Sequence, residues 1–157
     1  MPTLYIMRHG KAENTSPDIK RHLSSAGKEN VRSVAKLLSD KDTKINRVLY
    51  SPAERAKQTA LLMCEGLNIA PENQLEDARI YNATVSELQT VLSEINEQLE
   101  SVLLVGHNPG LADLVLSLSA EPVSLSAGNI AVLYADSWDD IHHCKCKFIE
   151  KYHHKEV

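Results

Sequence analysis

The sequence predicts an α/β fold, a three-layer sandwich in which helices cover both faces of a mostly parallel central sheet. Short apolar runs of strand length alternate with amphipathic stretches of helical spacing. The clear runs are each followed by a polar loop and then by a helical pattern. The chain has 157 residues, of which 43% are hydrophobic, so one core can form. We therefore expect a single domain over residues 1–157.

The first strand is expected at residues 3–7, and the helix that follows it begins near Ser24 and Ser25. Serine favours the N-cap position because its side-chain oxygen accepts a hydrogen bond from a free amide of the first turn. Apolar residues recur at helical spacing from residue 31 to residue 38, which gives this helix a stripe that packs on the sheet.

A second buried strand is expected at residues 47–50. Ser51 and Pro52 follow it, and this pair is typical of an N-cap and of the first helical position. The next helix is therefore expected from about Pro52 to Cys64, and Gly66 marks its end.

The second half of the chain contains one more buried strand that is followed by a loop and a helix. Residues 101–105 form the cleanest buried strand, and an apolar-striped helix is expected at 111–118. The other expected elements are a weak strand or loop at 75–81, a helix at 85–95, and late antiparallel or edge strands at 130–134 and 145–152.

The charge and cysteine content exclude several classes of partner. Lys and Arg total 17 against 21 Asp and Glu, so the net charge of −4 gives no bulk field to attract nucleic acid or anionic lipid. No apolar run approaches the roughly 20 residues that span a bilayer. With three cysteines and no secretory leader pattern, we expect a cytoplasmic protein without disulfides, nucleic-acid partners or membrane contact.

Three polar clusters follow buried strands of the predicted sheet. They are residues 8–10 after the first strand, 51–55 after the second, and 106–107 after the strong later one. In open α/β sheets, ligands bind beyond the carboxyl ends of the strands, so clusters far apart in sequence converge on one pocket. We expect two arginines and two histidines to meet there.

The residue types in these clusters fit a bound phosphoryl group. Arg8 and Arg55 offer fixed forks of donors to phosphoryl oxygens. Arg8 also disfavours the charged form of the adjacent His9, which leaves that ring able to act as a nucleophile. Gly10 lets the backbone turn without a side chain in the pocket, and a protonated His107 would stabilise charge on the transferring group. Each residue alone fits a surface or loop position equally well, so their joint placement carries the prediction.

Four segments resemble the histidine phosphatase superfamily, whose fold is called phosphoglycerate mutase-like. They are LYIMRHG at 4–10, SPAERAKQT at 51–59, VGHNP at 105–109 and, typical of the SixA-type phosphohistidine phosphatase branch, RHLSSAG at 21–27. The resemblance covers roughly residues 3–135. It implies a hydrolase that cleaves a phosphate bond through a phosphohistidine intermediate on His9, with no metal and no other cofactor.

The resemblance also implies which residues contact the phosphate. Arg8, His9, Arg55 and His107 match the catalytic set without a substitution, and Arg21 is expected at the rim of the pocket. The substrate-binding residues are expected to be Arg8, Gly10, Arg21, Ser51, Arg55 and His107.

A carboxylate general acid of the larger superfamily members is not evident in this chain. Asn108 follows the second histidine, and residues 79–84 resemble the SixA-type branch rather than the mutases. An alkoxide leaving group needs a proton when it departs, whereas an imidazole leaves more easily. The sequence therefore favours a phosphohistidine-bearing protein as substrate. Asp18 is the preferred candidate for a weak proton donor, and Glu13 is the other nearby carboxylate.

Two other functions and one other site stay open from the sequence. The same chemistry fits small phosphate esters or phosphoserine proteins, and the fold also fits a phosphate-binding module without catalysis. Histidines and cysteines at 142–146 and 153–154 are metal-ligating residue types. We read the first of these segments as a strand whose side chains alternate between faces, so no metal site is expected.

Overall fold

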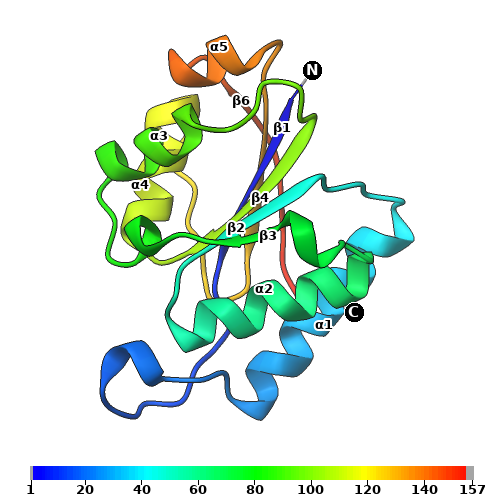
Figure 1. Cartoon of the computed structure of the whole chain (residues 1–157), viewed down its shortest axis with the longest axis vertical. Coiled ribbons are helices and arrows are strands. Elements are labelled where there is room, and N and C mark those ends of the chain that lie inside the picture. The colour runs from blue at the N-terminus through cyan, green and yellow to red at the C-terminus, as the bar shows by residue number, and fades with distance from the viewer. Residues whose placement is uncertain (1, 155–157) are drawn as a thin grey trace.

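The computed structural model describes residues 2–154 and confirms the predicted α/β fold (Figure 1). Its described part contains one six-stranded sheet with the strand order β3-β2-β4-β1-β5-β6. The first four strands along the chain pair in parallel, and the last two join antiparallel. The strands are β1 (Thr3–Arg8), β2 (Arg47–Tyr50), β3 (Gln74–Glu76), β4 (Ser101–Gly106), β5 (Ile130–Tyr134) and β6 (Lys147–Tyr152).

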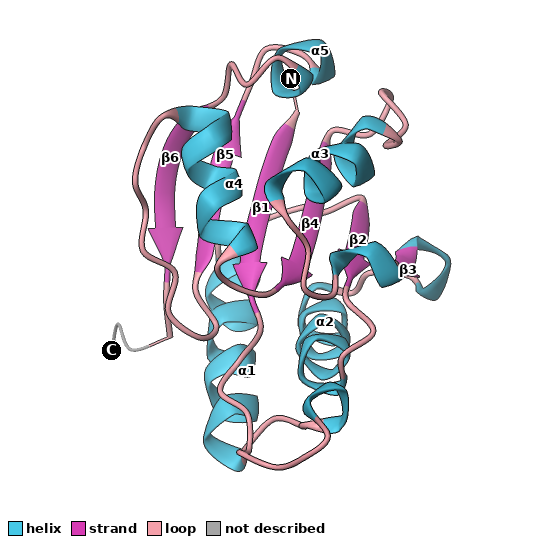
Figure 2. Ribbon diagram, turned by 90° about the vertical axis from the view of Figure 1, so that its left-hand side faces the viewer, coloured by secondary structure: helices cyan, strands magenta, loops and turns pink. Residues whose placement is uncertain are grey.

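Helices cover both faces of the sheet, which confirms the three layers (Figure 2). On one face lie α1 (Ser25–Asp40) and α2 (Glu54–Leu67), and on the other lie α3 (Val85–Ser93) and α4 (Gly110–Ser119). A short helix, α5 (Trp138–His142), packs with the second pair. Three 3₁₀ turns complete the structure at Asp18–Lys20, Pro71–Asn73 and Ala78–Ile80.

The central strand β4 shows why the sheet needs two covering layers. All six of its residues are buried. Val102 and Leu104 pack into the core formed with α3 and α4, whereas Leu103 and Val105 pack into the core formed with α1 and α2. Because strand side chains alternate between faces, an unbroken apolar run requires helices on both sides.

The start of α2 differs from the prediction, whereas the start of α1 agrees with it. Ser24 caps α1 and its hydroxyl accepts a hydrogen bond from the Gly27 amide at 2.9 Å. Helix α2 begins at Glu54, with Ala53 at the N-cap, so the placement of Pro52 at the first helical position was wrong. The hydroxyl of Ser51 is instead bonded to a histidine of the site described below.

Gly66 does not end α2 as predicted. The helix runs to Leu67, and Asn68 closes it in the left-handed conformation with φ of 55°. A Cβ at Gly66 would lie 2.6 Å from the Cβ of Ala35 on α1. Gly66 therefore permits the close approach of α1 and α2. This packing contact, and not helix termination, accounts for a glycine at this position.

The C-terminal segment was only partly predicted. Strand β6 is an antiparallel edge strand, as expected, but the reading of residues 142–146 as a strand was wrong. His142 ends α5, and Cys144 has a φ of 58°, which a strand cannot contain. Residues 2–154 contain no group of three or more His, Cys, Asp or Glu side chains placed to hold a metal ion.

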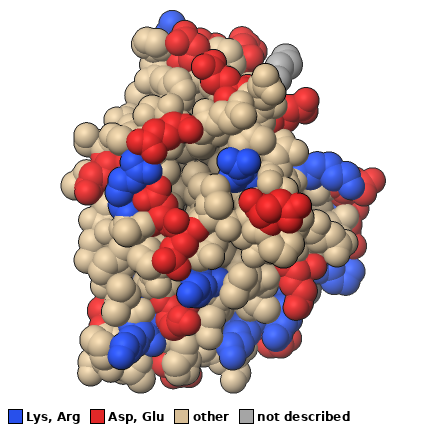
Figure 3. All heavy atoms as spheres, in the orientation of Figure 1, with Lys and Arg blue, Asp and Glu red and all other residues tan. Residues whose placement is uncertain are grey.

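Two further properties of the described residues bear on partners. None of their helices combines the length and the apolar character needed to cross a membrane. On the face shown in Figure 3, lysines and arginines are interspersed with acidic residues and form no continuous positive patch.

Gly27 provides a test of how the loop at residues 9–24 is held against α1. A Cβ at Gly27 would collide with the carbonyl oxygen of Lys11, which also accepts a hydrogen bond from the Ser24 amide at 2.9 Å. In an ordinary helix, Gly→Ala stabilises by about 1 kcal/mol. We expect Gly27→Ala instead to lower the free energy of unfolding by about 2 kcal/mol, measured by urea denaturation. The exposed Ser33→Ala in the same helix is the control, and a Gly27→Ala protein more stable than wild type would contradict the packing.

Candidate active site

The three polar clusters meet beyond the carboxyl ends of strands β1, β2 and β4, as the sequence predicted. Strand β4 lies between β1 and β2, and Arg8 is in register with Gly106 while Tyr50 is in register with Val105. The His9 amide donates to the Gly106 carbonyl at 3.0 Å, and the Ser51 amide to the Val105 carbonyl at 3.2 Å. The parallel pairing therefore continues past the strand ends and brings the site residues together.

His9 is nearly buried, and its ring is held in one orientation. Its Nδ1 lies 2.8 Å from the Gly10 carbonyl oxygen, which only accepts, so Nδ1 carries the proton. Nε2, on the other side of the ring, is therefore unprotonated and accepts a hydrogen bond from Nε of Arg55 at 3.3 Å. The Gly10 amide is itself fixed by donating to the hydroxyl of Thr59 at 3.0 Å.

The environment keeps both site histidines neutral. Burial is the main cause that lowers the pKa of His9 from its ordinary value of 6.5 to about 4, and the charges of Arg55, Arg8 and Arg21 add to it. The pKa of His107 falls from 6.5 to about 3, again mainly by burial and then through His9 and Arg55. Arg8 therefore lowers the pKa of His9, as predicted, but burial of the ring lowers it more.

These shifts predict how the free enzyme titrates. Because the pKa of His9 lies below the ordinary value, the ring stays unprotonated as the pH falls through 6.5 and gains its proton only near pH 4. NMR titration of the side-chain imidazole signals in the absence of phosphate should show no charge change at His9 or His107 between pH 7 and pH 5. A midpoint for His9 near 6.5 would contradict the buried geometry.

His107 faces His9 across the site, with 5.1 Å between the ring centroids. Its Nε2 is hydrogen-bonded to the Ser51 hydroxyl at 2.7 Å, and that hydroxyl also accepts from the Ala53 amide at 3.2 Å. Ser51 is fully buried. The structure thus gives Ser51 a position that orients His107, and the direct substrate contact expected from the sequence stays a prediction.

Polar atoms without partners point to an anion in this pocket. Nδ1 of His107 and Nε of Arg8 are buried and have no hydrogen-bond partner within residues 2–154. The guanidinium of Arg8 makes one bond, from Nη1 to the Leu125 carbonyl at 3.2 Å, and its pKa is lowered by burial and by Arg55. Buried polar atoms are usually hydrogen-bonded, so the N–H of Arg8 and a protonated Nδ1 of His107 could both donate to a ligand with several acceptor oxygens.

Asp18 forms the rim of the site, in the loop that projects below the sheet in Figure 1. Its carboxylate accepts from Nη2 of Arg55 at 3.1 Å, from Nη1 of Arg21 at 3.2 Å and from the Tyr81 hydroxyl at 2.6 Å. The hydrogen bond from Tyr81 is the largest cause that lowers the pKa of Asp18 to about 2. Asp18 is therefore ionised at neutral pH and carries no proton to donate, which argues against its expected role as a weak acid.

The rest of the rim agrees with the sequence in part. Arg21 lies at the rim as expected, where its Nε donates to the Glu13 carbonyl at 2.9 Å. Glu13, the other carboxylate considered as a donor, thus braces this loop through its backbone. Tyr81 was not identified from the sequence, although its ring stands edge-on to His107 with 5.5 Å between centroids. The sequence around Tyr81 contains no pattern that identifies it as a site residue. Its contacts with His107 and Asp18 depend on the path of the loop after β3.

Beside His107 the surface opens into a pocket of about 350 Å³. Asn108 is one of its walls, and its side-chain amide donates to the Leu125 carbonyl at 2.8 Å, which ties the loop before β5 to the site. The same loop reaches β1, because the Gly128 amide donates to the carbonyl oxygens of Arg8 and His9. This loop was also missed, since its contacts are mostly backbone contacts without a sequence pattern.

The comparisons with known proteins agree with this geometry. The family model described as Histidine phosphatase superfamily (branch 1) matches residues 4–96. Phosphohistidine phosphatase SixA of Escherichia coli (strain K12) is 32% identical over 117 residues, 73% of each chain, and an uncharacterized chloroplastic protein of Arabidopsis thaliana is 25% identical over 150 residues, 87% of this chain and 69% of the relative. A structure of the protein histidine phosphatase SixA complexed with tungstate has a TM-score of 0.85 at 27% identity and covers 96% of each chain.

Proposed function

The chain belongs to the histidine phosphatase superfamily and is a phosphatase, and from this premise we propose that it dephosphorylates phosphohistidine on proteins. The proposed reaction passes through a covalent phosphohistidine on His9. The observation that carries the proposal is the gathering of Arg8, Arg55 and His107 around a neutral His9, together with the ionised carboxylate of the nearby Asp18.

His9 is proposed as the nucleophile. Its protonated Nδ1 on the Gly10 carbonyl leaves the Nε2 lone pair to form the bond to phosphorus, and the same contact stabilises the ring as it becomes positive. When water later attacks the phosphorus, the P–N bond breaks and the ring leaves as neutral imidazole with its Nδ1 proton in place. The second half-reaction therefore needs no acid at His9.

Arg8, Arg55 and His107 are proposed to hold the phosphoryl oxygens. Arg55 uses three N–H groups on His9 and Asp18, and its guanidinium has further donors that remain free for a ligand. A phosphoryl dianion between these groups raises the pKa of His107, because an opposite charge favours the protonated ring. In the loaded site, His107 then donates a hydrogen bond and adds positive charge where charge spreads in the transition state.

The choice of phosphohistidine follows from the leaving group. Close to the proposed phosphoryl position, burial keeps His9 and His107 neutral in the free enzyme, and the donors around Asp18 keep that carboxylate ionised. General acid catalysis contributes typically about 10²–10⁴ in rate, and a strongly basic alkoxide depends on it more than imidazole does. The name of the relative SixA supports the same substrate class.

Comparative turnover tests the proposal. The wild-type protein should dephosphorylate a histidine-phosphorylated carrier or phosphorelay protein with a higher kcat/KM than a phosphoserine peptide or a sugar phosphate. Faster turnover of the esters would favour the alternative function, the same chemistry on phosphate esters. Tight binding of inorganic phosphate without turnover of any of these substrates would favour a phosphate-binding module.

A further inference from the structure

The carboxylate of Asp18 has one hydrogen-bond site left for a further donor. Its Oδ2 accepts from both Arg55 and Tyr81, whereas among residues 2–154 Oδ1 accepts only from Arg21. Each carboxylate oxygen has two lone pairs, so Oδ1 can accept one more donor. The side chain is 49% exposed, so this acceptor is accessible from solvent. An anion held in this way at the rim is a ready partner for an N–H group that enters with the substrate.

The chemistry of a phosphorylated imidazole requires such a partner. One ring nitrogen is bonded to phosphorus, and the other, the distal nitrogen, is free to hold a proton. When the P–N bond breaks, its electron pair moves into the ring. A ring with a protonated distal nitrogen leaves as neutral imidazole, whereas an unprotonated ring must leave as an anion. The useful protein group is therefore an acceptor that holds the distal N–H, and no proton needs to be delivered at the breaking bond.

The protein already uses this arrangement on its own side of the reaction. The distal nitrogen of His9 is Nδ1, and its proton is held by the Gly10 carbonyl at 2.8 Å. The substrate imidazole leaves the phosphoryl group in the first step, and His9 leaves it in the second. Each ring therefore needs an acceptor for the N–H on its distal nitrogen when it leaves. Gly10 is placed to serve His9, and the substrate ring requires an acceptor from another element.

Asp18 is placed near enough to the reacting residues to be this acceptor. It bonds directly to Arg55, which in turn bonds to Nε2 of His9, and its charge acts on His107. The groups that face it are Arg55 on α2, Arg21 in its own loop, Tyr81 after the 3₁₀ turn at Ala78–Ile80, and His107 after β4. All three hydrogen-bond partners donate to Asp18, and these bonds keep it an anion while the substrate ring is protonated.

We propose that Asp18 accepts the distal N–H of the substrate's phosphorylated imidazole and thereby selects phosphohistidine over phosphate esters. This inference rests on the proposed function. In the step, Nε2 of His9 forms the bond to phosphorus, the P–N bond to the substrate breaks, and the substrate imidazole departs neutral with its own distal proton. Asp18 is unprotonated before and after, so no proton is gained or lost by the enzyme.

Asp18→Asn tests the inference, because it keeps the shape and removes the charge. On a histidine-phosphorylated protein, we expect kcat/KM to fall about tenfold or more at pH 8, the size expected when a hydrogen bond to a charged group is weakened. The loss should shrink below pH 6, where an imidazole near its ordinary pKa is protonated by solvent alone. Turnover of p-nitrophenyl phosphate, whose leaving group has no ring nitrogen, should fall by less, so that the preference for phosphohistidine over this ester drops. Asp18→Glu should recover the pH profile in part.

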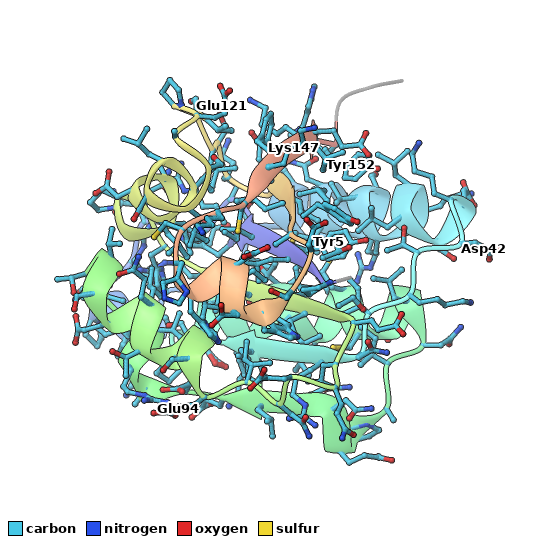
Figure 4. All side chains as sticks on the ribbon, turned by 90° about the horizontal axis from the view of Figure 1, so that it is seen from above. Tyr5, Asp42, Glu94, Glu121, Lys147 and Tyr152 are labelled. Carbon is cyan, nitrogen blue, oxygen red and sulfur yellow. The ribbon has the colours of Figure 1, made fainter. Side chains whose placement is uncertain are left out.

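Two controls separate this role from a structural one. Asp42→Asn makes the same charge change at the far end of α1, where φ is 59° and asparagine is well tolerated (Figure 4). Inhibition of the Asp18→Asn enzyme by inorganic phosphate reports whether the arginine clamp is intact. An Asp18→Asn enzyme that keeps the wild-type preference for phosphohistidine and its pH profile would overturn the role of Asp18 alone. Wild-type protein that hydrolyses the ester and leaves phosphohistidine intact would overturn the proposed function itself.

Discussion

His9→Ala should lower the turnover of a phosphohistidine substrate by at least about 10⁴-fold, because loss of a covalent nucleophile removes the whole two-step route. The substitution removes the ring that the Gly10 carbonyl and Arg55 hold in place, with its unprotonated Nε2. Single-turnover and steady-state rates at neutral pH measure the effect directly.

The exposed His143 provides the matched control for this change. It lies after α5, where its Nδ1 contacts the Asp139 carbonyl at 2.8 Å, and His143→Ala should leave turnover unchanged. The His9→Ala protein should still show a cooperative thermal transition. Turnover by His9→Ala within a few-fold of wild type would exclude His9 as the nucleophile.

Arg55→Lys should reduce kcat/KM by about 10²–10³-fold, although the charge is retained. The guanidinium of Arg55 bonds at once to Nε2 of His9 and to two oxygens of Asp18, and a lysine ammonium cannot reproduce this planar geometry. Loss of one preorganised donor to a transition-state charge typically costs about this much. Inhibition by inorganic phosphate should weaken in parallel, because the same fork is proposed to bind its oxygens.

Arg32→Lys is the control for this second prediction. Arg32 is exposed on α1 and pairs only with Glu29 at 2.6 Å, so the same chemical change there should be neutral. If Arg55→Lys keeps wild-type kcat/KM and phosphate inhibition, Arg55 does not bind the phosphoryl group.

The sequence predicted the catalytic edge of the sheet well because the relevant signals are local. An arginine, a histidine and a glycine directly after a buried strand must lie at the strand's end, and parallel neighbours bring their own ends to the same edge. His9 and His107 meet for this reason, with their ring centroids 5.1 Å apart. The N-cap at Ser24 is equally local and was also predicted correctly.

The features that were missed depend on contacts between distant segments. The lowered pKa of Asp18 is caused mainly by the hydrogen bond from Tyr81, which is 63 residues away along the chain, so sequence proximity to His9 did not reveal it. Helix α2 starts later than Pro52 suggests because the Ser51 hydroxyl is engaged by His107 and by the Ala53 amide. In each case a tertiary contact overrides the local preference of the residue.

Asp18 also changes how the absence of a general acid is understood. In the sequence, the lack of a carboxylic acid near the nucleophile appears only as a missing residue of the larger family members. In the structure, a carboxylate is present and bonded to Arg55, Arg21 and Tyr81, in the form that accepts protons. Under the proposal above, this carboxylate holds the N–H of a protonated imidazole as it leaves, a hydrogen bond that an alkoxide cannot donate.

Transfer of a labelled phosphoryl group tests the central claim most directly. Wild-type protein is mixed with a histidine-phosphorylated protein carrying labelled phosphate, quenched in alkali, and digested for mass spectrometry. We expect the label on His9 in wild type and no label on the protein in His9→Ala. Label on another residue, or hydrolysis of the substrate at the wild-type rate by His9→Ala, would contradict a reaction through phospho-His9.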